Sequence, residues 1–222
     1  MDRNIQKNGL INLFLMLVMG VAGFSTARYA DSLAGQVAMS FAALGLLVAF
    51  VSWFQMRLEE TERLEKLEYE ELSKSKGGST LFESKGAEVF PAQHSREQFE
   101  RYFVPVFTVL LLIGQGAGAY FLWRWVAKAG ETATLKQPMV AMALFGLFAL
   151  ILFMIGKFSA TLARLEQHRL LRPGAGYVLL NAYLCFVVAL GIVGVEAGFA
   201  RVDVYVAKGL CVLLGLVAIE NL

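Results

Sequence analysis

The sequence predicts an all-α, polytopic integral membrane protein with six transmembrane helices and a cytoplasmic helical excursion between the second and the third. Six apolar stretches have the length of a span, and the chain is 57% hydrophobic and only 17% charged, whereas soluble domains average about 25% charged residues. A helix needs roughly 20 mostly apolar residues to cross the hydrocarbon core of a bilayer. The predicted spans are 9–27, 34–55, 104–126, 138–158, 175–198 and 203–220.

Basic residues between the spans predict the orientation, because Lys and Arg near span ends are retained on the cytoplasmic side. The N-terminal tail, the connection between spans two and three, and the connection between spans four and five together hold 14 Lys and Arg, and the other three connections hold 6. We therefore expect both termini and the long central connection to lie in the cytoplasm.

The first apolar stretch has a second interpretation. Arg3 and Lys7 precede an apolar run from Leu10 to Phe24, and small residues follow it. This order also occurs in cleaved signal peptides, although the run is long for a signal sequence. If it were removed, five spans would remain.

The chain divides into a transmembrane hairpin (1–55), a cytoplasmic part with a charged helix, a linker and an amphipathic helix (56–103), and a four-helix transmembrane bundle (104–222). The charged helix, MRLEETERLEKLEYEELSKSK, continues from span two and contains acid-first pairs four residues apart, which support a helix. The pairs are Glu59 with Arg63, Glu62 with Lys66, and Glu70 with Lys74. A solvated stalk is favoured, and a coiled-coil partner site is the alternative, since the leucines do not sustain a heptad.

The amphipathic helix is predicted to begin after the linker residues Gly77, Gly78, Ser79 and Gly86. Ser95 and Gln98 have the spacing of a capping box, so we expect Ser95 to be the N-cap. The helix should lie along the membrane surface and turn into span three near Pro105. Aromatic residues bracket that span as an interfacial belt would.

Polar and small residues inside the spans are the candidates for function. Gln115 and Asn181 are amides within spans three and five, and Glu196 is a carboxylate near the external end of span five. Ionisable groups inside a bilayer are functional candidates by default, while amides there most often bond a neighbouring helix. Gly114 with Gly118, and Gly194 with Gly198, have the small-x-x-x-small spacing that lets another helix approach closely.

The sequence predicts no catalytic residue, no cofactor and no metal site. Phosphate-loop, His-Glu-x-x-His, nucleophile-elbow and dinucleotide motifs are absent. His94 and His168 lack partners at metal-ligand spacing. Cys185 and Cys211 both lie inside spans, where packing is their expected role. A net charge of +2 without a basic cluster argues against a nucleic-acid partner.

Four strings carry a resemblance to a known family. They are LFES at 81–84, SREQFERYFVP at 95–105, HRLLRPGAGYVLLNAYL at 168–184 and AIENL at 218–222. They resemble the N-terminal multi-span region of bacterial SPFH (band 7, HflK-like) membrane proteins, whose SPFH domain is absent from this chain. The resemblance implies a bacterial cytoplasmic (inner) membrane location and a scaffold that forms large oligomers or regulates a membrane-bound protease.

The leading functional hypothesis is a non-enzymatic membrane anchor and assembly module of a larger complex. Its expected partners are the lipid bilayer and either further copies of itself or other membrane-protein subunits. Because an apolar helix runs almost to Leu222, we also expect the chain to be the membrane portion of a longer protein. A transporter or channel component using Gln115, Asn181 and Glu196 is the alternative, and an enzyme acting through His168 is the third hypothesis.

Overall fold

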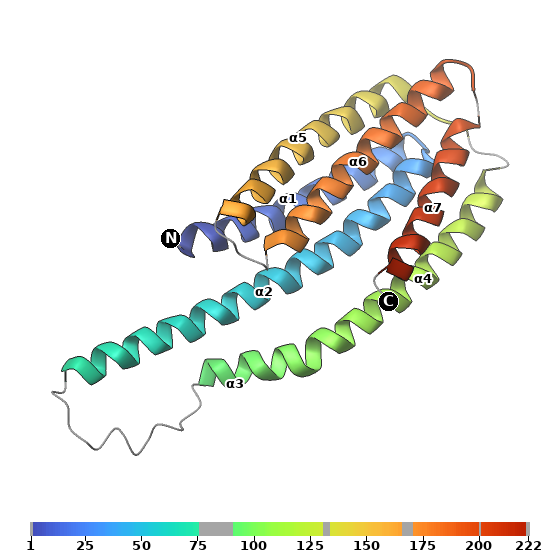
Figure 1. The fold of residues 1–222 in the computed structure, drawn as a ribbon. Helices are drawn as coiled ribbons and strands as arrows, with labels where there is room; N and C mark the ends of the chain where they lie inside the picture. Colours follow the sequence, from blue (N-terminus) through green and yellow to red (C-terminus); the bar gives the residue numbers. More distant parts are fainter. Residues whose placement is uncertain (1, 76–90, 131–133, 166–170, 200, 221–222) are drawn as a thin grey trace.

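The computed structural model describes residues 2–75, 91–130, 134–165, 171–199 and 201–220, and no strand occurs in these ranges. The chain folds into helices that run back and forth along one common direction (Figure 1). In order they are α1 (Asp2–Tyr29), α2 (Leu33–Ser75), α3 (Pro91–Gln98), the π-helical segment η2 (Phe99–Phe103), α4 (Val104–Ala129), α5 (Pro138–Leu165), α6 (Leu171–Glu196) and α7 (Val202–Glu220).

Five helical stretches among the described residues are long and apolar enough to cross a membrane: Gly9–Tyr29, Leu33–Glu68, Gln93–Ala129, Pro138–Arg164 and Ala175–Glu196. They contain the first five predicted spans, apart from the last two residues of the fifth. The sixth coincides with α7, which has 19 residues and is not among the five. The all-helical prediction is confirmed, and the count of six spans stays a prediction.

The core is formed mainly by α1, α2, α5, α6 and α7, and it joins the predicted hairpin to the predicted bundle in one cluster of buried side chains. Gly35 shows how closely α1, α2 and α5 approach. A Cβ at this position would lie 2.8 Å from Phe145 Cζ and 2.9 Å from Ala27 Cβ, distances that real Cβ atoms almost never show. The bundle therefore depends on a small residue where these three helices meet.

Helix α4 is peripheral. It packs mainly on α7 and touches α2 little, and Gln115 and Val126 are its buried residues. In Figure 1, its first half and α3 diverge from the rest of the bundle. Much of the apolar surface of α4 therefore makes no contact with the other residues that the structure describes.

Helix α2 is continuous from Leu33 to Ser75, which confirms that the charged helix extends span two. The predicted pair of Glu62 with Lys66 is an ion pair, with 2.5 Å between Lys66 Nζ and Glu62 Oε1. The side chain of Lys74, the linker and the LFES string lie outside the described residues. The charged half of α2 thus projects from the apolar bundle as one rigid rod.

The prediction for the amphipathic helix was partly wrong. Helix α3 begins at Pro91, so Ser95 lies inside the helix and is not its N-cap. The helix also does not turn sharply near Pro105, because α3, η2 and α4 form one gently curved run (Figure 1).

The η2 segment explains how the helix passes Pro105. A proline inside an α-helix removes a hydrogen bond and its ring clashes with the carbonyl four residues earlier. Just before Pro105 the backbone widens, and the Val104 N–H donates to the carbonyl of Phe99, five residues back. A local π-helix is a known way to absorb such a disturbance.

Candidate functional site

Gln115 of α4 and Asn181 of α6 are both buried inside the bundle. Gln115 is 1% exposed and Asn181 is 2% exposed. The side chain of Gln115 lies close to that of Tyr177, one turn before Asn181 on α6. A Cβ on Gly45 of α2 would lie 3.1 Å from Asn181 Nδ2 and 3.4 Å from Tyr177 Cδ1. Tyr177 therefore lies beside Gln115 of α4 and, together with Asn181, beside α2.

Each of these two amides keeps one buried oxygen without a hydrogen-bond partner, Gln115 Oε1 and Asn181 Oδ1. Asn181 Nδ2 donates only to the Met16 sulfur at 3.5 Å, and sulfur is a weak acceptor. Buried polar groups are normally paired. Gln115 and Asn181 therefore each keep a buried acceptor that no described group satisfies.

Glu196 lies apart from these amides. It is the last residue of α6 and is exposed. Within the described ranges, Glu196 forms no ion pair with Arg124 or Arg201. The three polar candidates therefore do not meet at one site.

Gly194 and Gly198 belong to the turn after α6. Gly198 lies beyond the end of the helix with φ of +96°, a conformation that favours glycine. Phe199 N–H donates to the Gly194 carbonyl at 3.0 Å, and Gly198 N–H donates to Val195 at 3.0 Å, which is the Schellman pattern of a helix end. Gly198 thus ends the helix, and only Gly194 remains on it.

Gly114 and Gly118 lie on the open side of α4. A Cβ at either position, or at Gly116, would meet no atom within 4 Å. Nearby Ile113 and Phe121 are strongly exposed. No helix within the described residues therefore packs on the Gly114–Gly118 face of α4.

The sequence analysis missed a buried carboxylate at the opposite end of the bundle from the stalk. Asp203, at the start of α7, is 5% exposed. Its Oδ1 accepts from Ser32 Oγ at 2.8 Å, and its Oδ2 accepts from Leu33 N–H at 2.8 Å. The N–H of Ala34 lies close to the same carboxylate. Asp203 thus caps the first turn of α2 from another helix.

The sequence contains one of the signals that would predict this cap. Ser32 directly before an apolar run has the form of an N-cap, and its Oγ accepts from Gly35 N–H at 3.0 Å. Nothing in the sequence pairs Ser32 with a residue 171 positions away. Beside this cap, exposed Lys136 contacts Asp31 at 2.8 Å, and hydrogen bonding to Asp31 raises the pKa of Lys136.

A second missed cluster joins the stalk to α3. The Arg96 guanidinium lies 2.8 Å from Glu100, 3.1 Å from Glu62 and 3.3 Å from Glu59. We call these four residues the Arg96 clamp. Hydrogen bonds from Lys66 and then Arg96 lower the pKa of Glu62 despite its burial, and Glu100 and then Glu62 raise the pKa of Arg96.

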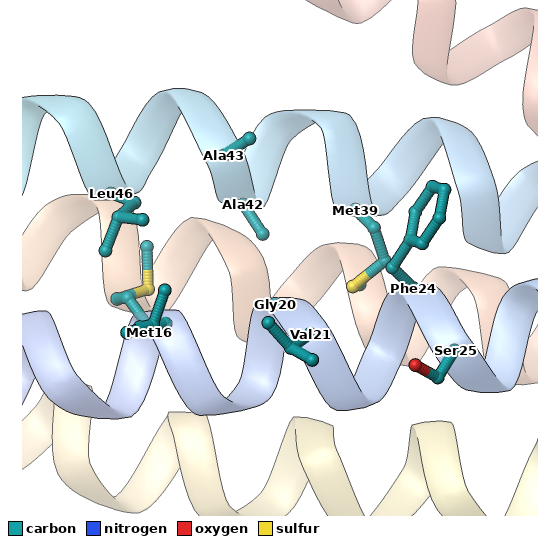
Figure 2. A pocket seen from close by; sticks show the side chains of 10 residues that line it. Met16, Gly20, Val21, Phe24, Ser25, Met39, Ala42, Ala43 and Leu46 are labelled. Atoms are coloured by element: carbon teal, nitrogen blue, oxygen red, sulfur yellow. The ribbon is translucent and has the colours of Figure 1, made fainter.

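An apolar hollow of about 300 Å³ lies between α1 and α2. Figure 2 shows Met16, Gly20 and Phe24 on one side and Met39, Ala42 and Leu46 on the other. Among the residues that line it, Ser25 has the only polar side chain. The hollow therefore offers packing space and no group that would orient a polar ligand.

The cysteines and histidines among the described residues do not form a functional site either. Among the residues that the structure describes, no group of three metal-ligating side chains occurs. Cys185 and Cys211 are buried free thiols, and His94 bonds Gln98 within α3. His168 lies outside the described residues.

Together these features define an all-helical protein whose apolar helices fit a multi-pass membrane protein. Comparisons with protein-family models, with curated proteins and with solved structures found no match.

Proposed function

We propose that this chain is a non-enzymatic membrane module that anchors and assembles a larger bacterial membrane complex. One observation carries the proposal: α4 exposes the Gly114–Gly118 stripe and most of its apolar surface on a side that none of the described helices covers. Small residues at this spacing let helices approach closely in a bilayer, where packing rather than hydrophobicity drives association. The proposed partner is another copy of the chain or another membrane subunit.

The charged stalk supports the same proposal. It extends α2 well past the apolar part of the helix and is fixed to α3 by the Arg96 clamp. A rigid rod of this kind can hold an attached part at a set distance from the bilayer. We further propose the predicted inner-membrane location with cytoplasmic termini, and a scaffold or protease-regulating role of the SPFH type.

The proposal predicts a loss of oligomers when the α4 stripe is blocked. Gly114→Leu combined with Gly118→Leu should leave the fold intact, because both side chains would point into open space. We expect the wild-type chain to be oligomeric in mild detergent and the double variant to dissociate at least about tenfold more readily, a difference of about 1.4 kcal/mol. Light scattering after size-exclusion chromatography measures this.

The matched control is Gly176→Leu with Gly209→Leu, two open positions on α6 and α7. It should leave the oligomer unchanged. A wild-type monomer, or equal dissociation by both double variants, would contradict the assembly role of α4.

A transporter or channel component is the second candidate, and the unpartnered oxygens of Gln115 and Asn181 favour it. The exposed position of Glu196, away from both amides, argues against it. The assembly module and the transporter differ in whether water reaches the buried amides. In a variant with Cys185 and Cys211 replaced by Ala, a cysteine at Asn181 would react with a membrane-impermeant thiol reagent if a water-filled path existed. We expect no reaction, and rapid modification would favour transport.

A further inference from the structure

The wide turn at η2 changes the direction in which the side chains of α3 point relative to those of α4. In this turn the Val104 N–H donates to the carbonyl of Phe99, five residues back, whereas an α-helix uses the carbonyl four residues back. A π-helical turn therefore takes up one residue more than an α-helical turn. Because α3, η2 and α4 form one run, the extra residue rotates α3 by about 100° around the helix axis.

The buried residues of α4 mark the side of this run that faces the bundle. Gln115 and Val126 are buried, and they are 11 positions apart, which is about three turns of an α-helix. Their side chains therefore point to the same side. In Figure 1, α2 also lies on the bundle side of the run.

Arg96 and Phe99 mark the side of α3 and η2 that faces α2. Arg96 forms ion pairs with Glu59 and Glu62 of the stalk. The ring centroid of Phe99 lies 4.9 Å from that of Phe54 on α2. Both contacts require this side of α3 and η2 to face α2, so the rotation of α3 about its axis decides whether they form.

The spacing between Arg96 and Gln115 shows what the wide turn contributes. The two residues are 19 positions apart. In an uninterrupted α-helix, this spacing misses a whole number of turns by about 100°, so Arg96 would point away from the bundle side. With one residue taken up by the wide turn, the remaining spacing is about five whole turns. Arg96 then points to the same side as Gln115.

We infer that the wide turn at η2 sets the register of α3: it rotates this helix so that Arg96 faces the stalk and the Arg96 clamp can form. Pro105 explains why the wide turn lies where it does, because a proline disturbs the helical turn before it. The angle between Arg96 and Gln115 explains what the wide turn achieves.

Distances between the stalk and α3 test this role in the full chain. Spin labels are placed on cysteines at Leu64 and His94, which are exposed. Cys185 and Cys211 are replaced by Ala. The measured quantity is the fraction of molecules that show the distance of the chain with the natural spacing.

An Ala inserted after Thr108 should break the clamp. The spacing between Arg96 and Gln115 then grows by one residue, and Arg96 points away from the bundle side whether or not the wide turn is kept. We expect the fraction at the natural distance to fall by about tenfold, because both interhelical ion pairs are lost together.

Deletion of Arg101, an exposed residue of η2, should preserve the clamp. An α-helix without a wide turn then has the correct spacing between Arg96 and Gln115. Pro105→Ala accompanies the deletion, because the proline ring would clash in such a helix. The matched control is an Ala inserted after Ala92, which lies before Arg96 and leaves the spacing unchanged. Both variants should keep the natural distance.

Three results would overturn the register role. They are the natural distance in the insertion after Thr108, a loss of that distance in the deletion of Arg101, and an equal loss in the control insertion. Circular dichroism and the oligomer size check that each variant is folded. If the deletion variant does not fold, the two insertions still decide. None of the changes alters Gly114 or Gly118, so a negative result leaves the assembly proposal standing.

Discussion

Replacing Asp203 with Ala is expected to lower the free energy of unfolding by about 3 kcal/mol, the largest effect of any single substitution proposed for this chain. The change removes the acceptor for Ser32 Oγ and for the N–H group of Leu33. A buried donor left without a partner costs about 1–3 kcal/mol. For a chain of this size the midpoint of thermal unfolding should fall by about 6–12 °C.

The native thiols provide the measurement. Cys185 and Cys211 are buried, so a thiol-reactive dye reports unfolding in detergent as they become accessible. Asp203→Asn keeps one carbonyl oxygen and should lose less. Lys136→Ala, which removes only the exposed ion pair with Asp31, should cost less than about 1 kcal/mol. Equal midpoints for Asp203→Ala and Lys136→Ala would refute the capping role.

Replacing Arg96 with Ala is expected to separate α3 from the stalk. The variant loses both interhelical ion pairs, to Glu59 and to Glu62, each worth up to about 1 kcal/mol in a partly exposed setting. The fraction of molecules with α3 packed on α2 should fall by about tenfold. Spin labels on cysteines at Leu64 and His94, which are exposed, would report a longer and broader distance distribution.

The same contact should depend on pH. Because the folded state lowers the pKa of Glu62, its stabilisation of the contact is complete above the ordinary pKa of 4.5 and is lost as the pH falls through the lowered value. Arg96→Ala should weaken this dependence, although Lys66 still pairs with Glu62. Glu97→Gln, which affects a bond within α3, is the control. Distances that stay unchanged from neutral to strongly acidic pH would show that the clamp does not hold α3.

The sequence alone was sufficient to predict the helices that are defined by long apolar runs or by local charge pairs. Long apolar runs predicted the bundle helices, and acid-first charge pairs predicted the continuation of α2 as far as Ser75. The start of α3 was misjudged because two start signals compete there. Pro91 at the first helical position is as good a signal as the Ser95 capping box, and the structure uses Pro91.

The packing of the helices could not be predicted in the same way. A span that is apolar on all sides gives no sign of which side faces protein, so the peripheral position of α4 and the burial of Gln115 became visible only in the structure. The Asp203 cap likewise joins positions 171 residues apart. Gln115 and Asn181 were predicted to lie within spans, but no spacing rule could indicate that both are buried against other helices or that Tyr177 lies close to Gln115.

The unbroken backbone of α2 has a mechanical consequence. Its 43 residues make a rod about 65 Å long, and no proline interrupts it. A torque applied to the charged end at Glu62 must therefore turn the segment around Gly45 as well. The same rotation reaches Leu33, whose amide is held by Asp203. The Arg96 clamp and the cap at Asp203 are in this way connected by one continuous helical backbone.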